Sequence, residues 1–412
     1  MRLAWFTPLP PMLSGIADYS SELLPLFAEA ADVDVICPRP SLLRRAKAPP
    51  GIVIRPPERF RPDRYDAIYY HLGNNPWHEF VYETALRHPG ICVFHDVVMH
   101  HLIAHAMVES GDQVARYERL LGVEHGDSGS RLARLKVLAV ASDFEKFLFP
   151  LSGHLVRRAE GVVVHSLDSR DRLLAAAGNI DVPVEVIPHH AGAPPPQVAG
   201  IDRAEARRRL GLPQDAFLVG HLGFVTLPKQ PGALVAGFAH LYRETPHAKL
   251  LVVGADNTGG AFERTARRHG VHGAVVSTGY VDLVAFYLNL KALDVVVNLR
   301  YPTAGESSGT FARALAEGRA AIVNNYGSFA EVPRDVALKV EVDGDQAAEL
   351  GEHLVQLARD PALRTTLEAN AREYARTVLN PLRCRDLYLA FAQTIRARPA
   401  AVTTERRSDP TT

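Results

Sequence analysis

Residues 302–318, PTAGESSGTFARALAEG, place one carboxylate, Glu306, before a group of small polar residues and an alanine-rich amphipathic stretch that closes at Gly318. The first amides of a helix have no intrahelical acceptor and lie at the positive end of the helix dipole, where a phosphate is favoured. The segment therefore indicates an anion site, although a serine cap followed by a core helix explains the same pattern. The residues that would open the helix are Ser307, Ser308, Gly309 and Thr310.

The run ALDVVVNLR, just before this segment, is typical of a buried strand. Similar apolar runs alternate with helical stretches along the whole chain, which is the pattern of parallel sheets built from βαβ units. Parallel strands share one carboxyl edge, where doubly wound sheets bind ligands, so the anion site is expected there. The expected strands are 3–9, 33–38, 52–56, 67–73, 91–96, 161–166 and 184–190 in a first series, and 217–224, 249–256, 274–281, 292–300, 320–325 and 337–342 in a second.

The two series predict two domains, which also suits a chain of 412 residues. The proline- and glycine-rich stretch AGAPPPQVAG (191–200) separates them and is interpreted as a linker. We expect an N-terminal domain over 1–192 and a C-terminal domain over 201–378. The stretch 97–158 is long for one crossover, and either a packed solvated helix or an acceptor-side insertion explains it.

The composition excludes several classes of protein. Basic and acidic residues balance at 46 each, so the chain lacks the positive field that gathers nucleic acid. The cysteines Cys37, Cys92 and Cys384 are far apart and have no metal-ligand spacing, which favours a reducing cytoplasm. No apolar run approaches the ~20 residues of a membrane span, and the N-terminus begins with a strand-like run, so no secretion is expected.

With these residues in place, the sequence resembles the family-4 retaining glycosyltransferases, which have the GT-B fold. The diagnostic segment is VVVNLRYPTAGESSGTFARALAEGRAAIVNN, in the subgroup form Gly-Glu-x-Ser-Gly. The resemblance implies an α/β fold with two Rossmann-like, doubly wound parallel-sheet domains facing across a cleft. It also implies that Glu306 contacts the donor sugar and that the amides of Ser308, Gly309 and Thr310 bind the donor diphosphate.

Two positions depart from the family pattern. Arg313 stands where the family has a glutamate that accepts from ribose hydroxyls, and arginine has no acceptor atom. In GHLGFVTLPKQ (220–230), Gly223 and Lys229 match a cationic phosphate element, but Phe224 replaces its arginine. Arg313 could therefore face the diphosphate, or pair with Glu317 one helical turn on.

The N-terminal half offers further site residues by the same resemblance. Ser14 and Gly15 form the turn after the first strand, where the family backbone approaches the donor phosphate, and His95 matches a histidine that contacts the donor sugar. Val281 is expected near the nucleotide base. Residues expected on the acceptor side, or left open between function and packing, are Asp18, His71, Asn74 and His165; Asp96 ends the same strand as His95.

The function implied is transfer of a sugar, with retention, from a nucleotide-diphosphate sugar to an acceptor hydroxyl, and a hexosyltransferase is expected. The acceptor would be a saccharide, a lipid-linked molecule or another hydroxyl compound. No cofactor, metal or nucleic acid is expected, the location is cytoplasmic, and peripheral contact with the inner face of a membrane stays open. Alternatives are a GT-B sugar phosphorylase or epimerase and a non-catalytic nucleotide-sugar-binding relative; a dinucleotide-dependent oxidoreductase is disfavoured because no strand precedes Gly-x-Gly-x-x-Gly.

The C-terminal stretch 363–395 predicts two helices broken at Asn380-Pro381, because proline disfavours helix at the residue before it. The second helix, 381–397, has an apolar face around Tyr388 that is too large for an exposed tail. In GT-B proteins the final helix packs back on the N-terminal domain, and we expect the same here. Residues 398–412 are expected to be disordered.

Overall fold

The computed structural model describes residues 1–12, 14–38, 51–109, 113–140, 142, 144–178 and 180–398. It divides into two compact units. Unit 1 contains Met1–Pro188, Ala304–Ser307 and the C-terminal segment from Pro381, and unit 2 contains His189–Thr303 and Ser308–Asn380. Apart from Arg398, the expected disordered tail lies outside the described residues.

Unit 1 is built on a seven-stranded parallel sheet in the order β3-β2-β1-β4-β5-β6-β7. The strand order reverses between β1 and β4, which makes their carboxyl ends the switch point of this sheet. The strands are β1 Arg2–Phe6, β2 Asp32–Ile36, β3 Ile52–Arg55, β4 Ala67–Leu72, β5 Ile91–Phe94, β6 Gly161–Val164 and β7 Val184–Val186. All seven expected strands of the first series are confirmed.

Helices cover both faces of the unit 1 sheet. Residues 97–158 hold α4, α5 and α6, and α5 carries non-helical backbone at Gly126, where φ is 60°. The helices of unit 1 are α1 Gly15–Ala28, α3 Glu79–Arg87, α4 His100–Ala104, α5 Val114–Val137, α6 Gly153–Arg158, α7 Leu167–Ala177 and α16 Pro381–Ala397.

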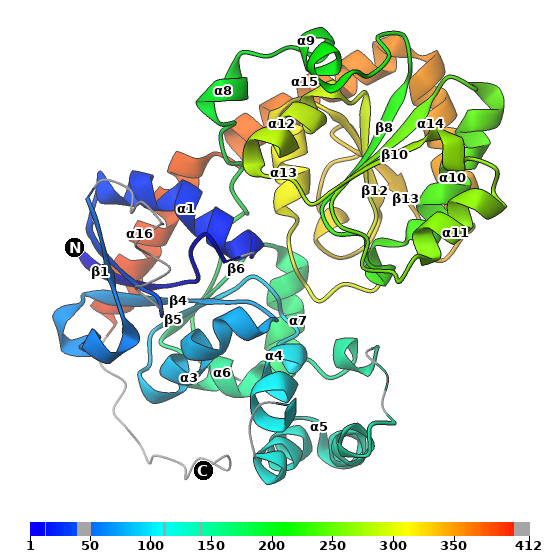
Figure 1. Ribbon diagram of the computed structural model, residues 1–412. Helices are drawn as coiled ribbons and strands as arrows, with labels where there is room; N and C mark the ends of the chain where they lie inside the picture. Colours follow the sequence, from blue (N-terminus) through cyan, green and yellow to red (C-terminus); the bar gives the residue numbers. More distant parts are fainter. Residues whose placement is uncertain are drawn as a thin grey trace. The chain divides into compact units, whose positions relative to one another are not determined.

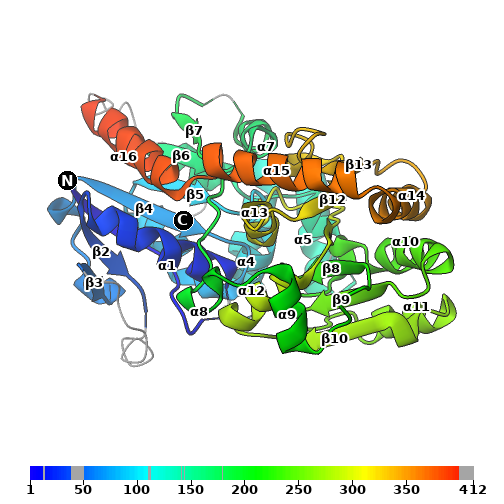
Figure 2. The ribbon, with the colours of Figure 1, turned by 90° about the horizontal axis from the view of Figure 1, so that it is seen from above.

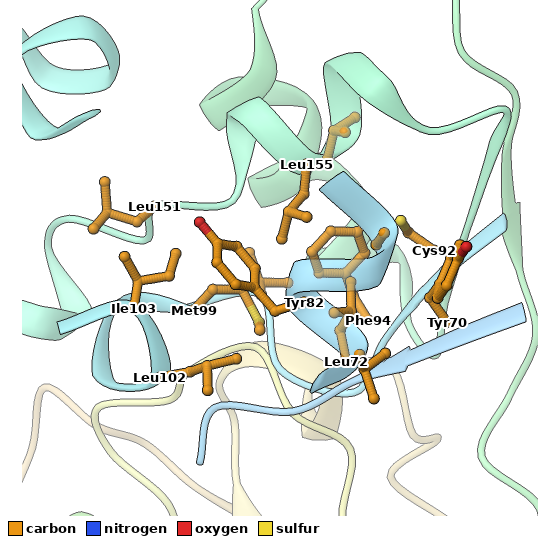
Figure 3. Close-up of a cluster of buried hydrophobic side chains, with 14 of the residues drawn as sticks. Tyr70, Leu72, Tyr82, Cys92, Phe94, Met99, Leu102, Ile103, Leu151 and Leu155 are labelled. Carbon is orange, nitrogen blue, oxygen red and sulfur yellow. The ribbon is translucent and has the colours of Figure 1, made fainter. Parts of the chain in front are cut away.

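One face of this sheet carries a buried core made with α3, α4 and α6. Figure 3 shows part of it, with Tyr82 of α3 and Leu155 of α6 among the side chains of β4 and β5. The Tyr82 hydroxyl bonds Nε2 of His154 at 3.1 Å, which satisfies the polar end of an otherwise apolar ring.

The other face packs against α1 and α16 (Figures 1 and 2). Tyr388 of α16 is fully buried, and its ring lies 5.4 Å from that of Tyr69 and 5.6 Å from that of Trp5, centroid to centroid. Its hydroxyl bonds the Tyr19 hydroxyl at 3.0 Å, and its carbonyl accepts from the Tyr69 hydroxyl at 2.6 Å. Helix α16 is therefore part of the core of unit 1.

Unit 2 is built on a six-stranded parallel sheet in the order β10-β9-β8-β11-β12-β13. Its switch point lies between β8 and β11. The strands are β8 Leu218–Leu222, β9 Lys249–Val253, β10 Val275–Gly279, β11 Val295–Asn298, β12 Ala320–Asn324 and β13 Leu338–Val340. The six strands of the second series are thereby confirmed, and so is the expected α/β fold with two parallel sheets.

The helices of unit 2 also lie on both faces of their sheet, with α10, α11 and α14 on one side and α12 and α13 on the other (Figure 1). Helix α15 ends four residues before α16 begins, so the expected break near Asn380 is present. The helices of unit 2 are α8 Pro196–Ala199, α9 Arg203–Leu210, α10 Pro231–Glu244, α11 Ala261–Arg268, α12 Leu283–Ala292, α13 Gly309–Ala316, α14 Gln346–Arg359 and α15 Pro361–Thr377.

Residues 191–200, expected as a linker, instead pack on unit 2. The Tyr287 hydroxyl donates to the carbonyl of Gly192 at 2.8 Å, and the Ala191 amide donates to the carbonyl of Leu379 at 2.9 Å. Val198 of α8 is buried. The prolines do prevent a long helix, but tertiary hydrogen bonds fix the extended chain to its neighbours.

Replacing Tyr388 by alanine should lower the free energy of unfolding by about 3–5 kcal/mol, because a buried aromatic ring and its hydrogen bond are both lost. Urea denaturation followed by circular dichroism measures the change. Leu382→Ala on the same helix is the matched control, since Leu382 is 46% exposed and should change stability by less than about 0.5 kcal/mol. Equal effects of the two substitutions would contradict the assigned packing of α16.

Candidate functional site

The start of α13 is organised by the side chain that ends β11. Asn298 is buried, and its amide donates to the Ser308 hydroxyl at 2.9 Å and to the Thr310 hydroxyl at 3.2 Å. The Ser308 hydroxyl is also the N-cap and accepts from the amide of Phe311 at 3.3 Å. The first turn is therefore held in one orientation, with the amides of Gly309 and Thr310 at the positive end of the helix.

A second loop brings a cation to this helix end. Gly223 follows β8 with φ of 90°, and a Cβ atom there would lie 2.8 Å from Nζ of Lys229 and 3.7 Å from Cγ2 of Thr310. The Gly223 backbone also lies against Gly254, where an added Cβ would come within 2.3 Å of the Gly223 carbonyl oxygen. Glycine is thus required at both positions, and the Lys229 ammonium lies beside the first turn of α13.

Arg313 lies in the last turn of α13. Its side chain is buried, and its Nη1 atom would lie 3.2 Å from a Cβ atom on Gly309, so the guanidinium folds back toward the first turn. The partner considered from the sequence, Glu317, instead forms an ion pair with Lys291 at 2.5 Å. Of the two expected positions for Arg313, the geometry favours the one toward the anion site.

His221, which the sequence did not single out, is buried within β8. Burial, with the positive charges of Lys229 and Arg300, lowers its pKa to about 3. Its Nε2 atom has no hydrogen-bond partner within the described ranges. A neutral imidazole is therefore maintained beside Lys229, and it adds no positive charge to the site.

Two aromatic rings stand at the carboxyl edge of the same sheet. Phe224 and Tyr280 stack with their centroids 6.3 Å apart and their planes at 22°, and they are 41% and 58% exposed. Val281 follows Tyr280 in the sequence and is half-buried. Helix α12 begins two residues later, at Leu283. Phe224 thus presents an apolar face where the resembled family has a cation.

In unit 1, three histidines form a hydrogen-bonded chain at the carboxyl ends of β4, β5 and β6. Nδ1 of His71 lies 2.9 Å from Nε2 of His95, and Nδ1 of His95 lies 3.1 Å from Nε2 of His165. Nδ1 of His165 lies 2.8 Å from the carbonyl of Ile187, which can only accept. With neutral rings, each Nδ1 therefore carries the proton, and Nε2 of His71 is left as an acceptor.

This chain occupies both ring nitrogens of His95, which is buried. The predicted sugar contact of His95 therefore stays a prediction, and it would require one of these bonds to open. His71 is enclosed by Trp5, whose ring centroid lies 4.2 Å away. Its Nε2 atom has no hydrogen-bond partner in the part of the chain that the structure describes.

The other expected residues of unit 1 lie around the same sheet edge. The amide of Asn74 donates to Asp96 at 2.8 Å, and its side-chain oxygen accepts from the amide of Leu102 at 3.0 Å, which fixes the loop after β4 to α4. Ser14 caps α1 through the amide of Ile16, and a Cβ atom on Gly15 would meet nothing within 4 Å. Asp18 lies in the first turn of α1.

Glu306 and Ser307 belong to unit 1, although the sequence places them within the C-terminal half. The carbonyl of Ala304 accepts from the amides of Val97 and Val98, at 2.8 and 2.9 Å. Both valines follow His95 and Asp96 in the loop after β5. Glu306 is half-buried, and the segment that carries it is hydrogen-bonded to this loop.

Within the described ranges, no group of three or more His, Cys, Asp or Glu side chains is arranged to hold a metal ion. The described helices include none that is long and apolar enough to cross a bilayer. Metal independence and cytoplasmic location stay predictions.

The fold of this chain is similar to that of solved structures. The structure is similar to that of Anabaena Alr3699/HepE in complex with UDP and glucose, with a TM-score of 0.66, 16% identity, and coverage of 96% of this chain and 100% of the other. The two parallel-sheet units therefore have the GT-B fold. Residues 202–374, which lie within unit 2 apart from Ala304–Ser307, match the model of the family Glycosyl transferases group 1.

Curated relatives carry the name D-inositol 3-phosphate glycosyltransferase. The protein from Thermomonospora curvata is 30% identical over 215 residues, which are 48% of this chain and 48% of the relative. The protein from Stackebrandtia nassauensis is 27% identical over 293 residues, which are 67% of this chain and 64% of the relative. The chain thus matches about half to two thirds of the length of these relatives.

Acid should destabilise unit 1 through its buried histidines. Burial lowers the pKa of His78 and of His165 to about 4, and it lowers that of His71 as well, against ~6.5 in an unfolded chain. Their stabilising contribution is full above pH ~6.5 and is lost as the pH falls toward 4, because the unfolded state then binds more protons. Each histidine should contribute up to about 1.4 kcal/mol per pH unit in this window.

Urea denaturation between pH 7.5 and 4.5 measures this dependence. His78→Gln should make the slope shallower, while His272→Gln, at an exposed position of unit 2, should leave it unchanged. The same slope in wild type and His78→Gln would refute the role of His78.

Proposed function

We propose that the protein is a retaining glycosyltransferase that binds a nucleotide-diphosphate sugar on unit 2 and transfers the sugar to an acceptor hydroxyl. The observation that carries this proposal is the convergence of Gly223, the Lys229 ammonium and Thr310 at the first turn of α13. These residues lie in the part of the chain that matches the glycosyl transferases group 1. Helix amides and an ammonium group together suit a diphosphate, because each favours a negative ligand.

Phe224 stands where the resembled family has an arginine, and Arg313 would supply this second cation. Its guanidinium lies against Gly309, whereas an arginine at position 224 would have stood on the loop after β8. A guanidinium offers two parallel donors to a phosphate, so it can replace the missing cation from a different element. This placement leaves the ribose hydroxyls to other groups.

The proposed reaction breaks the bond between the anomeric carbon and the diphosphate oxygen, and forms a bond from that carbon to the acceptor oxygen on the same face. The acceptor proton passes to the departing diphosphate oxygen. Lys229, Arg313 and the α13 amides stabilise the charge that develops on the leaving diphosphate. Glu306 precedes the helix cap by two residues, so it is within reach of the hydroxyls of the attached sugar.

Exposed stacked rings support a role for Phe224 and Tyr280 near the nucleotide base, with Val281 beside them in sequence. UDP-sugars are the first donors to test, since the Anabaena structure contains UDP. The curated relatives' name makes inositol phosphates the first acceptors to test. A thermal-shift panel of UDP-, GDP- and ADP-sugars identifies the base; a shift with none of them would count against the proposal.

Lys229→Ala should weaken binding of the free nucleoside diphosphate by about tenfold and slow turnover, because one charge-assisted contact is lost. Isothermal titration calorimetry measures the affinity. The control is Lys249→Ala, which removes a lysine from the amino end of β9, at the opposite edge of the same sheet. Unchanged affinity in Lys229→Ala would make Lys229 a surface lysine only.

Glu306→Gln should lower kcat by at least about tenfold and leave diphosphate affinity within about twofold, since the change affects a sugar contact and none of the amides. Release of nucleoside diphosphate from the sugar donor measures turnover. Glu352→Gln, on the exposed surface of α14, is the control. Full activity of the Glu306 variant would exclude the proposed sugar contact.

A further inference from the structure

Segment 304–307, which carries Glu306, is fixed to unit 1 by three hydrogen bonds. The carbonyl of Ala304 accepts from two consecutive amides of the loop after β5, and the carbonyl of Gly305 accepts from Oγ of Ser169 at 2.6 Å. The Ser169 contact is the one side-chain bond of the three. It joins residues 136 positions apart in the sequence.

The backbone at Gly305 shows how closely this segment is packed. Its φ is 82°, in the region that favours glycine, and an added Cβ atom would lie 2.6 Å from Cγ2 of Val97. No larger residue could occupy this position without moving the loop after β5. The segment therefore has a preferred position, set by close packing and by hydrogen bonds at two successive carbonyls.

Ser169 is itself held in place. It is buried in the first turn of α7, and its amide donates to the hydroxyl of the N-cap residue Ser166 at 3.1 Å. The two hydroxyls lie 2.7 Å apart. Since the Ser169 hydroxyl donates to Gly305, it accepts from Ser166, and the two bonds in series strengthen each other.

Helix α7 is anchored in the core beyond this turn, because Leu173 and Ala177 are both buried there. The first turn of α7 thus holds Ser166 and Ser169 in place, and the Ser169 hydroxyl bonds the carbonyl of Gly305, the residue before Glu306.

We propose that Ser169 is a positioning residue for Glu306: it fixes the backbone from which the Glu306 carboxylate reaches the donor sugar. This inference rests on the proposed function for the role of Glu306. The alternative is that the Ser169 hydroxyl only satisfies a buried carbonyl and contributes to stability. The two differ in what its removal does to turnover, because a displaced catalytic group lowers kcat while a merely structural loss need not.

The test compares Ser169→Ala, Ser169→Thr and Ser152→Ala in the full-length chain. Ser152 is a matched control, since it is also a fully buried serine of unit 1 at the start of a helix, α6. Ser169→Ala should lower kcat for release of UDP from a UDP-sugar about tenfold, with KM and the Kd for UDP within about twofold. Ser169→Thr, which keeps the hydroxyl, should restore kcat to within about threefold of wild type.

Hydrogen exchange gives a second readout that does not depend on activity. Peptides that cover residues 304–310 should exchange faster in Ser169→Ala, and at the wild-type rate in Ser152→Ala. Wild-type kcat in Ser169→Ala, an equal loss in Ser152→Ala, or unchanged exchange over 304–310 would each overturn the inference. If the wild type itself turned over no nucleotide sugar, the proposed function would fail, and the exchange experiment would still decide whether Ser169 holds the segment.

Discussion

The side-chain amide of Asn298 holds two hydroxyls at the start of α13, and the orientation of this first helical turn, where we propose that a diphosphate binds, depends on these two bonds. Because β11 runs parallel to β8, its last residue reaches the same sheet edge as the loop that carries Gly223 and Lys229. The helix amides and the ammonium group therefore lie close together, although the residues that carry them are far apart in the sequence. A parallel sheet thus brings residues that are distant in the sequence to one edge, because the carboxyl ends of its strands lie side by side.

Unit 1 uses its sheet edge differently. There the polar side chains are buried and bond to one another, from His71 through His95 to His165 and the carbonyl of Ile187. Burial lowers the pKa of His71 and of His165, because a charged imidazole would lose its hydration there. The chain fixes the strand ends, and the nearby Asn74 to Asp96 bond fixes the loops that follow them.

Much of the architecture could be predicted from the sequence, because buried parallel strands have short apolar sequences such as VVVN and ICVF. Gly223 and Lys229 could be proposed because they match a glycine and a cation of the phosphate element in the family that the sequence resembles. Asn298 and His221 were missed, because a polar residue at the end of a strand has no distinctive pattern until its neighbours are known. The orientation of the Arg313 side chain could not be predicted either, because it depends on the ion pair that Glu317 forms with Lys291 of α12.

The position of Tyr388 has a consequence for how the chain is made. Its hydroxyl bonds that of Tyr19, 369 positions earlier in the chain, so the apolar face of unit 1 formed by Trp5, Phe27 and Tyr69 stays uncovered until α16 has been synthesised. Domains generally fold as units while the chain emerges, but unit 1 cannot be completed before α16 leaves the ribosome. Most of unit 1 precedes unit 2 in the chain, yet unit 1 closes only after the residues of unit 2 and then α16 have been synthesised, and its aromatic surface stays exposed until then.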